Sequence, residues 1–287
     1  MQLTLASGRR VGVHHMAEGP GRTIVLCHAA PGSGLFDPDP ELTRERGITL
    51  IGVDRPGYGE SQPPTPGEWA DVPSAVADLE EVLREFGTTS VGVAGWSAGG
   101  RVALALAAHY PDLVDRVCVI STPAPDEDVP WMPDQARAGL ALLRDLAADE
   151  AIAGMIEQLA PVTPADPRSD EALGLVGASP ADEAALGQPG ARDRLTEMMV
   201  TAFAQGPIGM AADIAGYCLR PWGFEPSDVR TKTLLLYGAA DPLGGSAHGR
   251  WWQKQLPNAR LEMVPEAGHL VMIPMWKRVL SFLAPDR

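Results

Sequence analysis

Hydrophobic residues along the chain fall into two patterns, which predict two kinds of element. Short continuous apolar runs bounded by turns predict buried β-strands, and these cover residues 23–27, 48–53, 91–94, 116–120, 233–237 and 260–264. Apolar residues at helical spacing predict helices between the runs, most clearly over residues 72–86. Residues 2–17 alternate loosely around Gly8 and predict an antiparallel hairpin at a sheet edge. This alternation of strands and helices predicts an α/β fold with a mostly parallel, doubly covered sheet.

The alternation stops between residues 123 and 226. That stretch has no strand-like run, and its apolar residues follow helical spacing around Leu143, Met199 and Ile214. Prolines separate the predicted helices. Because the alternation resumes afterwards, we predict one core made of residues 1–122 and 227–287, with residues 123–226 inserted as a helical segment.

The sequence G-W-S-A-G at residues 95–99 joins the strand at 91–94 to an alanine-rich helix at 102–108. A serine on so tight a strand-to-helix turn has a strained backbone, and it needs small residues two positions to either side. Its hydroxyl is expected to stand exposed at the carboxyl end of the strand. Ser97 is therefore the candidate nucleophile.

A serine hydroxyl becomes an effective nucleophile only with a base in reach and a third group that orients the base. The last two predicted strands are each followed by a suitable group, Asp241 and then His269. In an open α/β sheet, sites assemble at the carboxyl ends of the strands. We therefore expect Ser97, Asp241 and His269 to meet at that edge.

These motifs, taken in order, resemble those of an α/β-hydrolase-fold serine hydrolase with a helical cap. The matching stretches are the turn around Ser97, H-x-x-P-G at 28–32, D-R-P-G-Y-G-E-S at 54–61, G-x-x-D at 238–241 and G-H at 268–269. The resemblance covers essentially the whole chain, with the inserted helical segment as the variable cap. It implies an enzyme of that fold, and we expect neither a cofactor nor a metal.

The resemblance also implies a role for each candidate residue. Ser97 would attack, His269 would act first as general base and then as general acid, and Asp241 would orient His269. Some family members carry the acid after an earlier strand, which makes Asp126 a competitor. We prefer Asp241 because it follows its strand after a short turn, whereas Asp126 lies in an acidic cluster where a carboxylate is expected to be solvated and poorly fixed.

Two backbone N–H groups would form the oxyanion hole in this family. They belong to Ala98, the residue after the nucleophile, and to Ala30 in the stretch after the first apolar strand. The family usually has glycine where this chain has Ala29, and a Cβ there narrows the permitted backbone geometry. His28 is expected to brace this loop rather than to react.

A serine at position 97 narrows the chemistry. Dehalogenases and epoxide hydrolases of this fold attack with aspartate, because water must later release an alkyl ester. Acyl transfer to water is therefore preferred, on a small to medium carboxylic ester, lactone or thioester.

The family leaves open an aminopeptidase, a C–C bond hydrolase and a cofactor-free perhydrolase. A non-catalytic sensory protein is also possible on this fold, but the complete set of Ser97, Asp241 and His269 favours an enzyme.

Composition restricts the partners and the setting. The chain has 287 residues, 45% of them hydrophobic, and a net charge of −14, which argues against nucleic acid and anionic membranes as partners. Residues 124–225 hold 17 acidic and 6 basic residues, either as a solvated exterior or as a surface that repels anions or binds an ammonium group. Three cysteines without disulfide or metal spacing, and no apolar leader or span, favour a cytoplasmic protein with a small-molecule substrate. The oligomeric state stays open.

The remaining histidines and apolar cap residues receive plainer interpretations. His14 and His15 point to opposite faces of an edge strand, so they cannot chelate together, and ordinary edge positions are expected. His109 and His248 are expected at the surface or at helix ends. Methionine and aromatic side chains of the insertion either line an apolar pocket or pack against the sheet; these are Met155, Met198, Met199, Met210, Phe203, Trp131 and Trp222.

Overall fold

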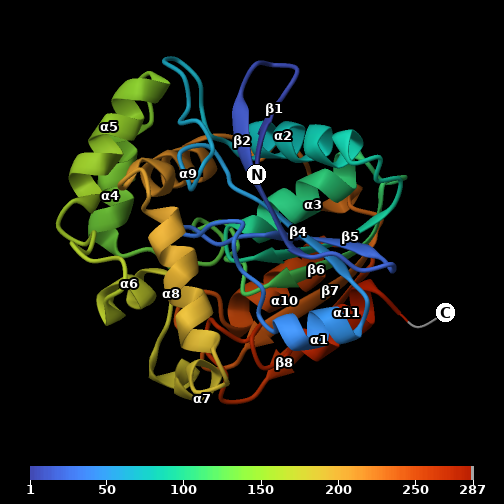
Figure 1. Cartoon of the computed structure of the whole chain (residues 1–287). Coiled ribbons are helices and arrows are strands. Elements are labelled where there is room, and N and C mark those ends of the chain that lie inside the picture. Colours follow the sequence, from blue (N-terminus) through green and yellow to red (C-terminus); the bar gives the residue numbers. More distant parts are fainter. Residues whose placement is uncertain (286–287) are drawn as a thin grey trace.

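A single eight-stranded sheet lies at the centre of the computed structural model, which describes residues 1–285 (Figure 1). Its strands lie in the order β1-β2-β4-β3-β5-β6-β7-β8. The strands are β1 (Gln2–Thr4), β2 (Arg10–Ala17), β3 (Thr23–Cys27), β4 (Thr49–Val53), β5 (Val91–Trp96), β6 (Val114–Ile120), β7 (Lys232–Gly238) and β8 (Ala259–Val264). Strands β3 to β8 pair in parallel, while β2 runs antiparallel to both β1 and β4. The predicted mostly parallel sheet and its edge hairpin are confirmed.

Alternate residues of the central strands pack against different layers. On β3, Val25 belongs to the apolar cluster that contains residues of α2 (Val72–Glu85), α3 (Gly99–His109) and α10 (Ser246–Gln255), and Ile24 belongs to the cluster that contains residues of α11 (Trp276–Leu283). This explains why the strands read as continuous apolar runs, since both faces are buried. Figure 1 shows helices on both sides of the sheet. The helices of the core are α1 (Pro40–Glu45), α2 (Val72–Glu85), α3 (Gly99–His109), α10 (Ser246–Gln255) and α11 (Trp276–Leu283).

The chain between β6 and β7 contains helices and no strand. Its elements are α4 (Asp134–Leu143), α5 (Ala148–Leu159), α6 (Asp170–Leu175), the 3-10 turn η1 (Pro180–Asp182), α7 (Glu183–Leu186), α8 (Ala191–Ala202) and α9 (Ile208–Leu219), followed by a second 3-10 turn, η2 (Pro226–Asp228). Helices α4, α5 and α9 share an apolar cluster of their own. We propose residues 123–226 as the cap and use that name for this segment below.

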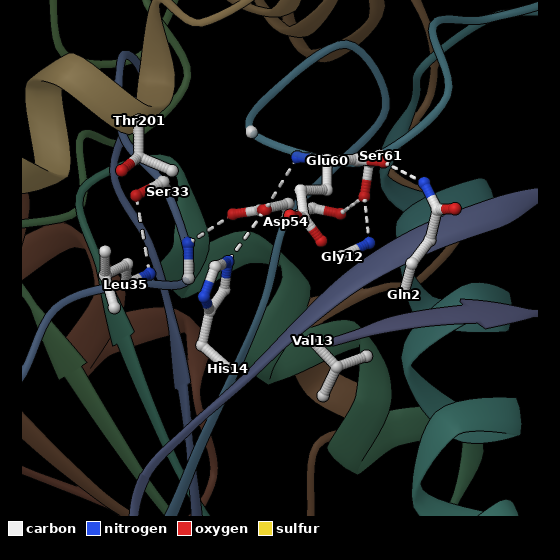
Figure 2. Close-up of polar contacts among 12 residues, drawn as sticks. Gln2, Gly12, Val13, His14, Ser33, Leu35, Asp54, Glu60, Ser61 and Thr201 are labelled. Carbon is white, nitrogen blue, oxygen red and sulfur yellow. Dashed lines mark hydrogen bonds and ion pairs between the residues drawn. The ribbon is translucent and has the colours of Figure 1, made fainter.

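The edge hairpin is tied to the sheet by a buried carboxylate, and here one expectation is wrong. His14 is not an ordinary edge residue, because its Nε2 lies 2.8 Å from Asp54 Oδ2 (Figure 2). The other Asp54 oxygen accepts the Gly34 amide at 2.7 Å, and Oδ2 also accepts the Glu60 amide. Asp54 therefore joins β2 to two loops at the carboxyl end of the sheet. Sequence spacing concealed this contact because 40 residues separate the two partners.

Candidate active site

Ser97 lies between β5 and α3 with a φ angle of 52°, a left-handed value that is uncommon outside glycine. Two hydrogen bonds hold it there. The Ser97 amide donates to the Ile120 carbonyl at 2.9 Å, and the Thr122 hydroxyl donates to the Ser97 carbonyl at 2.8 Å. A strained residue persists only where its surroundings fix it, and β6 supplies that constraint.

The glycines of the turn answer a steric requirement. A Cβ on Gly95 would lie 2.5 Å from the Cα of Gly100, and one on Gly99 would lie 2.1 Å from the Cys27 carbonyl oxygen. Real Cβ atoms do not approach other atoms so closely. The pattern of glycines around Ser97 therefore lets the start of α3 lie against both β5 and the end of β3.

Asp241 and His269 meet at the ends of β7 and β8. His269 Nδ1 lies 2.9 Å from Asp241 Oδ2, and the other carboxylate oxygen accepts the amides of Leu243 and Gly244 at 2.8 and 3.0 Å. Burial works to raise the pKa of Asp241, but the hydrogen bond and charge of His269, with the two amides, hold it below the usual value. The ionised carboxylate favours the tautomer with the proton on Nδ1, which leaves Nε2 as the basic atom.

His269 is held beside the turn that carries Ser97. Trp96 Nε1 donates to the His269 carbonyl at 3.1 Å, and the two rings are 6.0 Å apart. The Ser97 hydroxyl makes no hydrogen bond to another residue within 1–285. Contacts between nucleophile and base are often long without substrate and shorten when substrate binds. The arrangement thus places the three predicted residues at one end of the sheet, with the Asp241–His269 pair already formed.

Two cap residues that sequence reasoning missed pack on the loop of His269. Gly177 has a φ of +94°, and a Cβ there would lie 2.5 Å from His269 Cδ2. Asp182, 1% exposed, accepts the Leu270 amide at 2.8 Å. Neither residue carried a recognisable signal, because each acts through a partner about 90 positions away. The cap thereby covers the imidazole, which is itself 1% exposed.

The two amides predicted for an oxyanion hole are both available. No described residue accepts a hydrogen bond from the N–H of Ala30 or Ala98, and both residues border the same cavity as Ser97. Ala29 does not have a positive φ, so its Cβ is compatible with the loop. His28 Nδ1 lies 2.7 Å from the Ala29 carbonyl, and this is the bracing contact that the sequence suggested.

Arg55 donates hydrogen bonds to the loop after β3, which carries the Ala30 amide, and joins that loop to the cap. Its guanidinium donates to the carbonyls of His28 and Ala29 at 2.6 and 2.8 Å, and its Nε lies 2.9 Å from Asp213 Oδ2 on α9. Arg55 and Asp213 are 6% and 1% exposed. Burial works to lower the pKa of Arg55, but Asp213 outweighs that effect and raises it, whereas burial raises the pKa of Asp213 against the pull of Arg55. The three hydrogen bonds from the guanidinium to both oxygens of Asp213 have the geometry of an ionised pair. No local sequence pattern pointed to Asp213, which lies 158 positions from its partner.

The competing acid, Asp126, lies in a different environment from the one expected. It is not solvated: its oxygens accept the amides of Trp131 and Met132 at 2.8 Å and a hydrogen bond from Arg137 at 2.6 Å. Burial opposes ionisation, but these donors lower its pKa to about 2. Asp126 fixes the start of the cap, whereas the partner of His269 is Asp241.

His109 and His248 both lie near helix ends, but only His109 is exposed. His109 is exposed and lies 3.0 Å from the Gly223 carbonyl, as predicted for a helix end. His248 lies in the first turn of α10, as predicted for a helix end, but it is buried, and its Nδ1 accepts the Ala124 amide at 3.0 Å. Burial lowers its pKa, so it is a neutral acceptor that anchors the first residues of the cap.

A cavity of about 1100 Å³ opens over Ser97, between the sheet edge and the cap. It is large enough for a medium-sized organic molecule. Met155, Met210 and Trp131 border it, while Met198 and Met199 are fully buried in the core cluster beside the sheet. Both interpretations of the apolar cap residues therefore apply, each to part of the set.

Residues 1–285 contain no candidate metal cluster and no helix that could span a membrane. No group of three or more histidine, cysteine, aspartate or glutamate side chains there could hold a metal ion. None of the helices in that range is both long and apolar enough to cross a membrane. Cys27 and Cys118 are buried, and burial raises the pKa of Cys27 to about 12, so these thiols are protonated.

Comparison with known proteins agrees with this architecture. The family model of the alpha/beta hydrolase fold matches residues 22–274. A pimeloyl-(acyl-carrier protein) methyl ester esterase from Chromobacterium violaceum is 31% identical over 254 residues, covering 88% of each chain. A putative 2-succinyl-6-hydroxy-2,4-cyclohexadiene-1-carboxylate synthase from Bacillus subtilis is 24% identical over 282 residues, covering 95% of this chain and 93% of its own. The crystal structure of a bromoperoxidase from Bacillus anthracis superposes with a TM-score of 0.72 at 20% identity, covering 99% of both chains.

The chain belongs to the α/β-hydrolase fold family. It is an enzyme of that fold, and its similarity to named esterases identifies it as a hydrolase.

Proposed function

We propose that the chain is a serine esterase. It cleaves a small to medium carboxylic ester, lactone or related acyl compound through an acyl-enzyme on Ser97. The observation that carries the proposal is the buried Asp241–His269 hydrogen bond beside the strained turn of Ser97. The partner that the cavity suits is a small molecule.

The chemistry follows from the positions of these groups. His269 Nε2 accepts the hydroxyl proton as Ser97 attacks the carbonyl carbon, and the tetrahedral oxyanion is stabilised by the amides of Ala98 and Ala30. His269 then gives the proton to the leaving alcohol, and an ester joins the acyl group to Ser97. Water, deprotonated by His269, attacks that ester and releases the acid and the free serine.

The similar enzyme from Chromobacterium violaceum is named for a methyl ester, which supports an ester among the acyl compounds. Haloalkanes and epoxides are poor candidates, because attack by Ser97 would leave an alkyl ether that water could not hydrolyse. Peptide, C–C and perhydrolysis substrates share the same acyl chemistry, so they belong in the same panel of assays.

Replacement of the nucleophile tests the proposal. Ser97→Ala should lower turnover of a nitrophenyl acyl ester by about 10⁴- to 10⁶-fold while the fold is retained. A serine-directed phosphonate should add its mass to the peptide containing Ser97 in the wild type only. Ser246→Ala, which removes an exposed hydroxyl bonded to Arg250, is the matched control. Near-normal turnover by Ser97→Ala, or halide or diol release by the wild type, would contradict the proposal.

A further inference from the structure

Arg101 is a buried cation at the cavity. It lies on α3, four residues after Ser97, and is 5% exposed. Removing a charge from water is unfavourable, so buried arginines normally face a carboxylate. No carboxylate of residues 1–285 lies within salt-bridge distance of Arg101. The one oxygen that it contacts in that range is the Pro123 carbonyl, at 3.4 Å.

The groups around Arg101 offset its charge only in part, through the face of an aromatic ring and a hydrogen bond with Cys218, and none of them supplies a negative charge. The guanidinium carbon lies 4.5 Å from the centre of the Trp222 ring. Cys218 and Tyr217 are its other neighbours, and burial raises the pKa of both above their usual values. Both are therefore neutral near pH 7, and burial works on Arg101 in the direction of a lower pKa.

Two more unused donors border the same cavity. The Trp131 indole nitrogen and the Tyr217 hydroxyl are buried, and neither has a hydrogen-bond partner among the described residues; the same holds for Arg101 Nε. The three side chains come from the loop before α4, from α9 and from α3. Asp213 is the one buried carboxylate of the cavity wall, and Arg55 already binds it. Among the described residues, the buried side chains of the cavity wall thus offer three donors without a partner and no buried carboxylate that is free to accept from them.

We propose that the substrate carries a carboxylate, which Arg101 binds while Ser97 attacks the ester. This inference rests on the proposed function and names its substrate class. A carboxylate brings acceptors and no donor, and its two oxygens match the planar fork of a guanidinium. A purely apolar acyl chain would leave the buried charge and the two other donors without partners.

The acidic exterior of the cap does not contradict this site. The cap's 17 acidic and 6 basic residues repel an approaching anion, but solvent-exposed charges are screened over about 8 Å at physiological salt. Arg101 is buried and is screened far less. The exterior thus slows entry at low salt, while Arg101 determines which substrate binds.

Matched pairs of esters test the proposal. The first pair places the charge on the acyl side, as monomethyl adipate against methyl pentanoate. The second places it on the alcohol side, as butanoyl glycolate against ethyl butanoate. One charge-assisted hydrogen-bonded pair corresponds to roughly 10- to 100-fold in affinity. We expect kcat/KM of the wild type to favour the charged ester by that factor in one of the two pairs, which also tells the side of the carboxylate.

Variants of Arg101 then assign the preference. In Arg101→Gln the ratio of the two kcat/KM values should fall towards one, and in Arg101→Lys part of the preference should remain. If Arg101→Gln does not fold, competitive inhibition of the wild type by adipate, weaker for the uncharged diamide adipamide, replaces it. Equal kcat/KM values within both pairs, or an unchanged ratio in Arg101→Gln, would overturn the carboxylate site. Failure of the proposed function is distinguishable, since then no ester would acylate Ser97 at all.

Discussion

Two aspartates that follow strands near the site differ in what they hold. Asp241 binds the imidazole of His269 with one oxygen and two backbone amides with the other. Asp126 binds two amides and the guanidinium of Arg137. Both carboxylates have lowered pKa values, so ionisation alone does not distinguish them. The distinguishing feature is the partner, and only Asp241 touches the candidate base.

This difference predicts opposite kinetic outcomes for the same substitution. Asp241→Asn should lower kcat on a nitrophenyl ester by about 10⁴-fold near neutral pH, because an amide does not hold the required tautomer or offset the charge that His269 gains. Asp126→Asn keeps the shape and leaves His269 untouched, so its kcat should stay near that of the wild type. A crippled Asp126→Asn beside an active Asp241→Asn would show that the acid has been assigned wrongly.

At the scale of elements, the short stretch from α6 to η1 decides how the imidazole is enclosed. Gly177 lies so close to the His269 ring that a Cβ there would collide with it, and Asp182 accepts a hydrogen bond from the amide of Leu270, the next residue along the chain. These contacts come from the cap, while His269 itself follows β8 of the core. The burial of the His269 imidazole thus depends on the position of the cap relative to the core.

Gly177→Ala tests that dependence. The new Cβ meets the imidazole at 2.5 Å at a φ of +94°, so we expect the ring to shift and kcat to fall by about 10- to 100-fold. Gly206→Ala is the matched control, since Gly206 has a φ of +71° with nothing within 4 Å of the added Cβ. It also places an alanine at a left-handed φ, without the collision. Equal kcat values for the two variants would show that the contact with His269 does not matter.

The sequence predicted those features that depend on local patterns. The strands, the core helices and the turn at Ser97 follow from apolar runs, helical spacing and the steric needs of a tight turn. The contacts of Asp182, Asp213 and His14 could not be predicted, because each joins segments that lie far apart in the sequence and leaves no local pattern. For the same reason the sequence could not predict that no carboxylate of residues 1–285 pairs with Arg101, because that depends on all the residues that surround the cavity.

On the scale of the whole molecule, one buried ion pair joins the core to the cap. Arg55 extends from the loop after β4 to Asp213 on α9, and it also donates to two carbonyls of the loop that carries Ala30. The position of the cap and the geometry of the candidate oxyanion loop therefore both depend on the Arg55 side chain. A change in the pair is expected to affect stability and catalysis together.

Loss of the acidic partner should reveal this coupling. Asp213→Asn leaves the Arg55 charge buried and uncompensated, and we expect the free energy of unfolding in denaturant to fall by about 3–5 kcal/mol. Asp170→Asn is the control, because its pair with Arg192 is exposed, and such pairs contribute about 0–1 kcal/mol. Similar losses in the two variants would contradict a special role for the buried pair.

A double variant separates stability from positioning. Arg55→Met with Asp213→Leu removes both charges, and replacement of a buried pair by apolar side chains often restores stability. The carbonyls of His28 and Ala29 would still lack their donor, so the loop that carries the Ala30 amide would be less well held. We expect recovery of the unfolding free energy without recovery of kcat on a nitrophenyl ester. Recovery of both would show that Arg55 stabilises the contact between core and cap but does not position the oxyanion loop.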